Sequence, residues 1–342
     1  MRALIRFGLV SLFALSCSMP VVMAWGDTGH QLTARIAARR LTEAARRGIV
    51  ALVRGADDDI GLKSVLGKTG DPQPSQAKMS AAMARMATWP DCMGTTPEGN
   101  CKAKGVTGPW HFVDVGLFEG PGHLAERCGE GSCITEMIPR LISNLRSGTN
   151  LVVMTESGTT RTFKPDRQLR FLIHFLGDLH QPLHSVTNAD AGGNCVATTG
   201  FPGFKPQLHA TWDSALVAGA TSGTQGSVVT AILNEFQSEE ATVSSVTDAA
   251  QIANESFALA KSELYGKTIP LVPTIDHFVH VSTSKCSTQA PPEIATITVD
   301  GKASFENTQT HKLVREQLFK GGVRLAAILN DVFSGDHDDA TP

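Results

Sequence analysis

The sequence predicts an all-α fold, with helices joined by loops and at most short β-hairpins. Apolar residues recur at helical spacing through most of the chain, and alternating strand-like patterns are few. No internal repeat is evident. Two apolar helical segments, H-F-L-G-D-L-H-Q-P-L-H at residues 174–184 and L-H-A-T-W-D at residues 208–213, also carry histidines and carboxylates. We expect the fold to be organised around these two segments.

Local patterns place the individual elements along the chain. The expected helices cover residues 27–47, 75–89, 133–145, 166–181, 207–216, 228–236, 248–265 and 308–333. Ser75 is expected to cap the second helix, and Pro182 should end the fourth near Gln181. Short hairpins are expected at residues 152–162 and 296–305, and loops at residues 93–107 and 282–292.

Residues 1–24 have the pattern of a secretory signal peptide. Two arginines precede an apolar run at residues 7–15, and small residues follow at offsets typical of cleavage after Ala24. This stretch is too short for a membrane-spanning helix, and no other stretch of the sequence is apolar enough to span. We therefore expect a secreted or periplasmic protein that begins at Trp25. A weaker lipoprotein pattern ending at Cys17 is the minor alternative.

Residues 25–342 are expected to form a single helical domain with an acidic tail from about residue 335. Candidate ligand residues run from the start of this region to Asp213, and one cluster must gather them all. The chain carries 33 acidic and 30 basic residues and has no basic stripe. Attraction to nucleic acid therefore cannot come from side-chain charge alone, although bound metal ions would add positive charge locally.

Six of the seven cysteines lie after residue 24, and an even number in an exported chain favours disulfides. Two pairs would close short loops and leave a third, long-range pair. These pairs are Cys92–Cys101, Cys128–Cys133 and Cys195–Cys286. Other pairings remain open, as does a zinc site, although the sequence has no Cys-x-x-Cys.

The two central segments contain five candidate metal ligands. His174 and Asp178 are four residues apart and project from one helix face, and His209 and Asp213 repeat this spacing. His184 lies just past the end of the first helix. Imidazole and carboxylate groups suit zinc, and five candidates exceed the needs of one ion. Polar helix faces without metal are the alternative, but they would leave buried charges uncompensated.

Three further motifs complete a recognisable pattern: W-G-x-x-G-H at residues 25–30, W-P-D at residues 89–91 and W-H-F-V-D at residues 110–114. The ordered set resembles the zinc-dependent single-strand-specific nucleases of fungi and plants, also called the 3′-nucleotidase/nuclease family. The wider superfamily includes the bacterial zinc-dependent phospholipases C. The resemblance extends from Trp25 to about residue 331.

This resemblance implies a mostly α-helical fold around a cluster of three zinc ions. The first ion would bind Asp91, His111, His174 and Asp178; the second His184, His209 and Asp213; the third the amine and carbonyl of Trp25, His30 and Asp178. Asp178 would thus bridge two ions. The amine of Trp25 can serve as a ligand only if cleavage leaves it as the first residue.

The implied activity is that of an endonuclease and 3′-nucleotidase that hydrolyses single-stranded DNA and RNA to 5′-phosphate products. Hydroxide generated by the zinc ions would attack phosphorus in line, with Asp91 as the catalytic residue that orients it. Phe112 would stack on a base and Asp114 would bind its edge. Stacking favours single strands, because a paired base hides its faces. Single-stranded nucleic acids and 3′-nucleotides are the expected partners, and no stable protein partner is implied.

One position departs from the family pattern. Many relatives carry a basic residue near the phosphate where this chain has Gly94; Lys102 or Lys104 would have to substitute. His180 is expected to pack beside the site rather than bind metal, because it faces another side of its helix from His174. Two other functions stay open: a phospholipase C acting on phosphocholine lipids, and a non-catalytic exported zinc-binding protein. A choline cage would need more aromatic residues than this chain offers.

Overall fold

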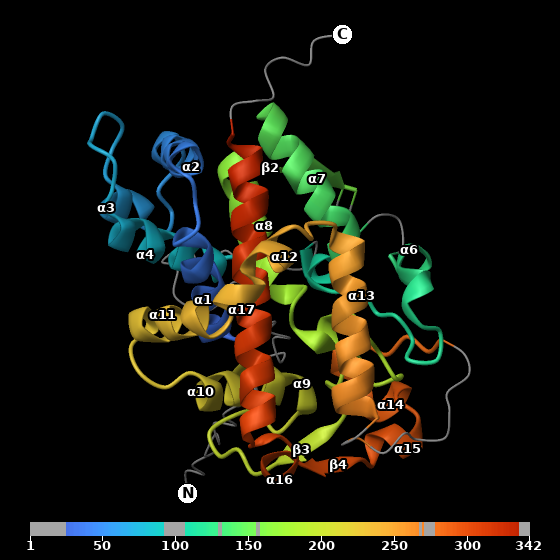
Figure 1. The fold of residues 1–342 in the computed structure, drawn as a ribbon. Coiled ribbons are helices and arrows are strands. Elements are labelled where there is room, and N and C mark those ends of the chain that lie inside the picture. Colours follow the sequence, from blue (N-terminus) through green and yellow to red (C-terminus); the bar gives the residue numbers. More distant parts are fainter. Residues whose placement is uncertain are drawn as a thin grey trace, which may run out of the picture.

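In this computed structural model, helices pack around one long helix, α17 (Thr308–Val332), that runs through the middle of the molecule (Figure 1). The structure describes residues 25–91, 107–128, 132–154, 158–266, 269 and 278–334. The described residues are mostly α-helical and form two small sheets, so the predicted fold class is confirmed. Helix α17 contacts helices from both halves of the chain and thereby joins them.

The remaining helices differ widely in length. The α-helices are α1 (Asp27–Ala38), α2 (Glu43–Gly55), α3 (Leu62–Leu66), α4 (Gln76–Ala87), α6 (Leu124–Arg127), α7 (Ile134–Ser147), α8 (Pro165–Asp178), α9 (Leu208–Ala210), α10 (Leu216–Ala220), α11 (Gln225–Glu235), α12 (Glu240–Ser244), α13 (Ala249–Leu259), α14 (Cys286–Gln289), α15 (Pro292–Ala295) and α16 (Gly301–Phe305). The 3-10 helices are Gly108–His111, Pro121–His123, Pro182–His184, Gln237–Glu239 and Thr283–Lys285. Two π-helical turns cover Thr211–Ala215 and Ala260–Tyr265.

Each sheet has two strands. Strand β1 (Leu151–Met154) pairs antiparallel with β2 (Thr160–Phe163), which confirms the hairpin predicted at residues 152–162. Strand β3 (Ala197–Thr199) pairs in parallel with β4 (Thr298–Asp300), at the bottom of the view in Figure 1. The hairpin predicted at residues 296–305 is therefore wrong. The Asp300 side chain accepts a hydrogen bond from the Ala303 N–H and starts helix α16 where a returning strand was expected.

Helix boundaries differ from the prediction at several places. The helix expected at residues 27–47 is two helices, because Thr42 caps a new one by accepting a hydrogen bond from the Ala45 N–H. The helix expected to reach Gln181 ends at Asp178, and a 3-10 helix follows it. Residues 282–292 were expected to form a loop but contain short helical turns. The cap predicted at Ser75 is confirmed, since its side chain accepts from the Lys78 N–H.

Helices α1 and α17 approach each other closely because two adjacent glycines lie between them. A Cβ atom on Gly322 would overlap the side chain of Ile36, and one on Gly321 would lie 3.1 Å from Thr33 Cγ2. Close packing against α17 fixes the position of α1, the helix that carries His30.

Two of the three suggested disulfides, Cys128–Cys133 and Cys195–Cys286, are confirmed. The Cys92–Cys101 pair lies outside the described residues, as do Gly94, Lys102 and Lys104, the predicted signal peptide and the tail from residue 335. Among the described residues, no single helix is long and apolar enough to cross a membrane. The bent pair Leu208–Ala220 and Gln225–Glu235 meets that requirement by length and composition when taken together.

Candidate metal centre

Eight of the nine predicted ligand residues lie in three buried groups. Within each group, the candidate ligand atoms lie within 4.8 Å of one another. The groups are His30, His174 and Asp178; Asp91, His111 and His174; and His184, His209 and Asp213. The chain thus gathers into one centre side chains from α1, α8, α9, the segment after α4, the 3-10 helices Gly108–His111 and Pro182–His184, and the π-helical turn Thr211–Ala215.

The group of Asp91, His111 and His174 lies beside Asp178, at the end of helix α8. His111 Nδ1 lies 2.9 Å from Asp178 Oδ2 and 3.1 Å from His174 Nε2. Asp91 Oδ1 lies 3.6 Å from His174 Nε2 and 3.9 Å from His111 Nδ1. Four side chains predicted to share one ion therefore point their donor atoms toward a common position.

Asp178 also faces His30, through its other oxygen. His30 Nε2 lies 3.2 Å from Asp178 Oδ1, whereas Asp178 Oδ2 faces His111 and His174. Neither ring nitrogen of His30 nor Asp178 Oδ1 has a hydrogen-bond partner among the described residues. Gly177 makes room for this approach, because a Cβ atom there would lie 2.7 Å from His30 Nδ1. A carboxylate with one oxygen toward each of two groups has the geometry needed to bridge two cations.

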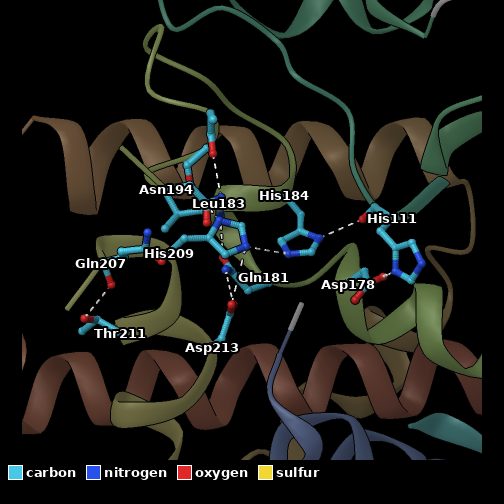
Figure 2. Close-up of polar contacts among 12 residues, drawn as sticks. His111, Asp178, Gln181, Leu183, His184, Asn194, Gln207, His209, Thr211 and Asp213 are labelled. Atoms are coloured by element: carbon cyan, nitrogen blue, oxygen red, sulfur yellow. Dashed lines mark hydrogen bonds and ion pairs between the residues drawn. The ribbon is translucent and has the colours of Figure 1, made fainter. Parts of the chain in front are cut away.

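The third group consists of His184, His209 and Asp213, and in it His184 points toward His209 (Figure 2). His184 Nε2 lies 3.2 Å from His209 Nε2, which lies 3.5 Å from Asp213 Oδ2. The Gln181 side chain donates a hydrogen bond of 2.6 Å to Asp213 Oδ1, leaving Oδ2 directed at the histidines. A π-helical turn, Thr211–Ala215, carries Asp213. Such turns occur frequently at functional sites.

Main-chain carbonyls orient three of the histidines. The Nδ1–H groups donate hydrogen bonds from His174 to the Ala87 carbonyl at 2.6 Å, from His184 to that of His111 at 2.8 Å and from His209 to that of Gly192 at 2.7 Å. A carbonyl only accepts, so Nδ1 carries a proton in each ring and Nε2 is the nitrogen that faces the group. Metal-binding histidines are commonly held in this way.

The donor set fits zinc in chemistry and in spacing. Zinc takes imidazole nitrogens and carboxylate oxygens at about 2.0–2.1 Å, so two ligands at tetrahedral angles are about 3.3–3.4 Å apart. The His184–His209 and His209–Asp213 separations of 3.2 and 3.5 Å, and the His30–Asp178 separation of 3.2 Å, are close to that value.

Buried carboxylates make this region strongly favourable for cations. Burial and the nearby charges of Asp91 and Asp178 raise the pKa of Asp213 well above its ordinary value. Burial lowers the pKa of His174, but the charges of Asp178 and Asp91 outweigh it and raise that pKa to about 10. Both shifts show that this cluster stabilises positive charge, which metal cations would provide.

The two predicted base-binding residues lie on the extended segment after His111. The Val113 N–H donates a hydrogen bond of 2.8 Å to the His184 carbonyl, which ties this segment to the centre. Val113 and Val115 are buried, whereas Phe112 and Asp114, on the alternate positions, are partly exposed. Burial and the charge of Asp190 raise the pKa of Asp114 to about 7.

Comparison with known proteins identifies the family. The family model described as S1/P1 Nuclease matches residues 25–334, most of the chain. This chain belongs to the S1/P1 nuclease family. Endonuclease 3 of Arabidopsis thaliana is 23% identical over 235 residues, 69% of each chain. Endonuclease 1 of the same plant is 25% identical over 355 aligned positions, 98% of this chain and 96% of the relative. Nuclease S1 of Aspergillus oryzae is 27% identical over 202 residues, 58% of this chain and 56% of the relative.

Membership in the S1/P1 nuclease family establishes a hydrolytic nuclease whose substrates are nucleic acids. The family is known for metal-dependent nucleases, and the three groups of histidines and aspartates could bind metal ions here. Among the predicted ligands, Trp25 stands apart, because its contribution would come from its main chain. Its indole is buried, and the adjacent Gly26 N–H donates a hydrogen bond of 2.8 Å to the Asp213 carbonyl.

Several residues that support the site of this S1/P1 nuclease could not be identified from its sequence motifs. Gln181 orients Asp213, and the Ala87 and Gly192 carbonyls orient histidines, although nothing in their residue types indicates these roles. His180 donates through Nδ1 to the Leu176 carbonyl, and its Nε2 accepts a hydrogen bond of 3.0 Å from Arg324. Its two nitrogens are therefore engaged away from the three groups.

Proposed function

We propose that this nuclease uses three zinc ions to hydrolyse single-stranded DNA, RNA and 3′-nucleotides, leaving products with a 5′-phosphate. The position of Asp178 carries the proposal. Its two oxygens face different groups of histidines, and it is fully buried. Although burial opposes it, the surrounding histidines hold the pKa of Asp178 well below its ordinary value, so the carboxylate is ionised and can bind a cation on each side, which supports a cluster of ions.

In the proposed assignment, Asp178 is shared by an ion at His30 and one at Asp91, His111 and His174. His184, His209 and Asp213 hold the remaining ion, and the Trp25 main chain completes the site at His30. When bound, zinc ions acidify water and stabilise the charge that develops on phosphorus oxygens and on the leaving 3′-oxygen.

Asp91 is the proposed catalytic residue among the protein groups. Although burial raises its pKa, the charges of His174 and His111 hold that pKa at about 2. Asp91 is therefore ionised at neutral pH and acts as a hydrogen-bond acceptor that orients the attacking water. Because such a low pKa makes it a weak base, its role is orientation and metal binding, not proton storage.

Recognition of single strands is proposed for the segment after His111. A partly exposed Phe112 ring can stack on an unpaired base, and the Asp114 carboxyl can bind the edge of that base. The hydrogen bond from Val113 to the His184 carbonyl keeps this segment beside the metal ligands, which supports a base bound next to the reacting phosphate.

We also propose that residues 1–24 are a cleaved signal peptide and that residues 25–342 form one exported catalytic domain. The two disulfides fit an extracellular or periplasmic location, where thiols are oxidised. A continuous hydrophobic core that runs from Trp25 to Val332 supports a single domain.

One set of assays tests the proposal. Protein beginning at Trp25 should contain three zinc ions per chain by metal analysis. It should cleave single-stranded DNA, RNA and a 3′-nucleotide much faster than duplex DNA, and leave phosphatidylcholine intact. A chelator should abolish activity, and added zinc should restore it. A single ion per chain, or full activity after verified removal of metal, would contradict the proposal.

A further inference from the structure

The loop between His184 and His209 contains an unusual backbone. Ala189 and Ala191 have φ values of 55° and 54°, a left-handed conformation that residues with a Cβ atom rarely adopt. Gly192 and Gly193 follow with φ values of 59° and 81°. Strained residues of this kind persist only where surrounding contacts impose them, and they cluster at ligand-binding sites. We call residues 188–195 the strained loop.

Asp190 anchors the strained loop from between the two alanines. Its side chain is fully buried and accepts hydrogen bonds from the Asn188 N–H at 3.0 Å and from the Tyr265 hydroxyl at 2.7 Å. The Cys195 N–H donates to the Asp190 carbonyl at 2.9 Å. Tyr265 comes from the π-helical turn after α13 and is the only tyrosine in the sequence. The Tyr265 hydroxyl thus holds the middle of the strained loop, while the Cys195–Cys286 disulfide holds its end.

The strained loop in turn contacts a candidate metal ligand. The Gly192 carbonyl accepts the Nδ1–H of His209, and the Gly193 carbonyl accepts the main-chain N–H of His209 at 3.3 Å. Gly192 fits tightly, because a Cβ atom there would lie 2.7 Å from the Leu183 carbonyl oxygen. A shift of the loop would therefore rotate or release the His209 ring.

We propose that Tyr265 and Asp190 are positioning residues for the group of His184, His209 and Asp213. They hold the strained loop so that the Gly192 carbonyl fixes the tautomer and ring orientation of His209. This inference rests on the proposed function, because it takes zinc as the ion that His209 binds. Groups that orient a metal ligand typically change metal affinity by about 10- to 100-fold when they are removed.

Tyr265→Phe is the cleanest test, because it removes one hydroxyl and keeps the ring. Asp190→Asn is less clean, since the charge of Asp190 also acts on Asp114. Zinc-loaded Tyr265→Phe protein is titrated with a chromophoric chelator. One ion per chain should be released at roughly tenfold lower chelator concentration than in the wild type, and the other two should be unchanged.

Two further variants separate positioning from general destabilisation. Phe236→Leu trims a buried ring that packs on Phe319 between α11 and α17, so it should lower thermal stability and leave zinc release unchanged. Ala189→Gly with Ala191→Gly removes the backbone strain, because glycine adopts the left-handed conformation readily. Added to Tyr265→Phe, these two changes should restore most of the lost affinity.

The outcomes distinguish the two proposals. Wild-type protein that binds no zinc would overturn the proposed function and this inference with it. Wild-type zinc content combined with unchanged zinc release in Tyr265→Phe would overturn the inference alone. If Tyr265→Phe weakens zinc binding and the alanine-to-glycine changes do not restore it, the hydroxyl does not act through the strained loop. That result would also overturn the inference.

Discussion

Two buried residues at the end of helix α8 show how sharply neighbouring positions differ in role. Asp178 directs its oxygens at three histidines from two groups. His180, two residues later, bonds instead to the Leu176 carbonyl and to Arg324, which also pairs with Glu255. Burial alone therefore does not identify a ligand; the direction of the side chain does.

Asp178→Asn and His180→Asn form a matched pair of substitutions. Asp178→Asn should lose at least one zinc ion and lower the cleavage rate by at least about 100-fold, because it removes the proposed bridge. His180→Asn should keep three ions and lose about 1–3 kcal/mol of stability, because the buried Nη1 of Arg324 loses its hydrogen bond to the His180 ring. Metal analysis and urea unfolding of both proteins would measure this, and equal zinc contents would refute the assignment.

Asp114 gives a prediction about pH. Its pKa in the folded protein is about 7, above the ordinary value of 3.8, so ionising it costs folding free energy. Relative to the unfolded chain, that cost appears as pH rises through the ordinary pKa, grows until about pH 7 and then stays constant. Asp114→Asn should therefore stabilise the protein more at about pH 8 than at about pH 5, by on the order of 1 kcal/mol because the group is partly exposed. Urea unfolding at both values tests this, and an equal effect would count against it.

At the scale of elements, the contact between α1 and α17 depends on the absence of side chains. Gly322→Ala should destabilise the protein by about 1–3 kcal/mol, because the new methyl group would overlap Ile36. Gly226→Ala, in helix α11 with no atom near the position of a new Cβ, is the control and should be neutral or slightly stabilising. Denaturant unfolding of the two variants would compare them, and equal stabilities would refute the packing argument.

Patterns within one segment predicted the elements and many candidate ligands, whereas contacts between distant segments escaped prediction. The four-residue spacing of His174 and Asp178 can be read from the sequence, because residues four apart are neighbours on any α-helix. The parallel pairing of β3 with β4 joins residues about a hundred positions apart, and the cap at Thr42 resembles an ordinary helical residue. The Ala87 carbonyl that orients His174 carries no sequence pattern at all, since every residue has a carbonyl.

At the scale of the whole molecule, the residue at which the chain begins should determine whether the metal site at His30 has all of its ligands. A free amine at Trp25 can bind metal, whereas an amide nitrogen has no available lone pair. Protein with a short extension before Trp25 should therefore fold, bind about two zinc ions and cleave single-stranded DNA poorly, because the ion at His30 loses ligands. Zinc analysis and cleavage rates of the extended and exact forms would measure the effect. Equal zinc and equal rates would refute the amine as a ligand and favour the lipoprotein alternative at Cys17.

The pairing of α1 with α17 also has a consequence for biosynthesis. A ribosome makes the segment with His30 early, but the helix that packs against it, which contains Gly322, is made almost three hundred residues later. Until that late helix emerges, α1 can pack against α4 and α8 but lacks one of its two largest contact surfaces. A nascent chain should therefore stay without a complete metal centre through nearly all of its synthesis. Loading with metal, and with it any cutting of the messenger being translated, would have to wait until the polypeptide is almost finished.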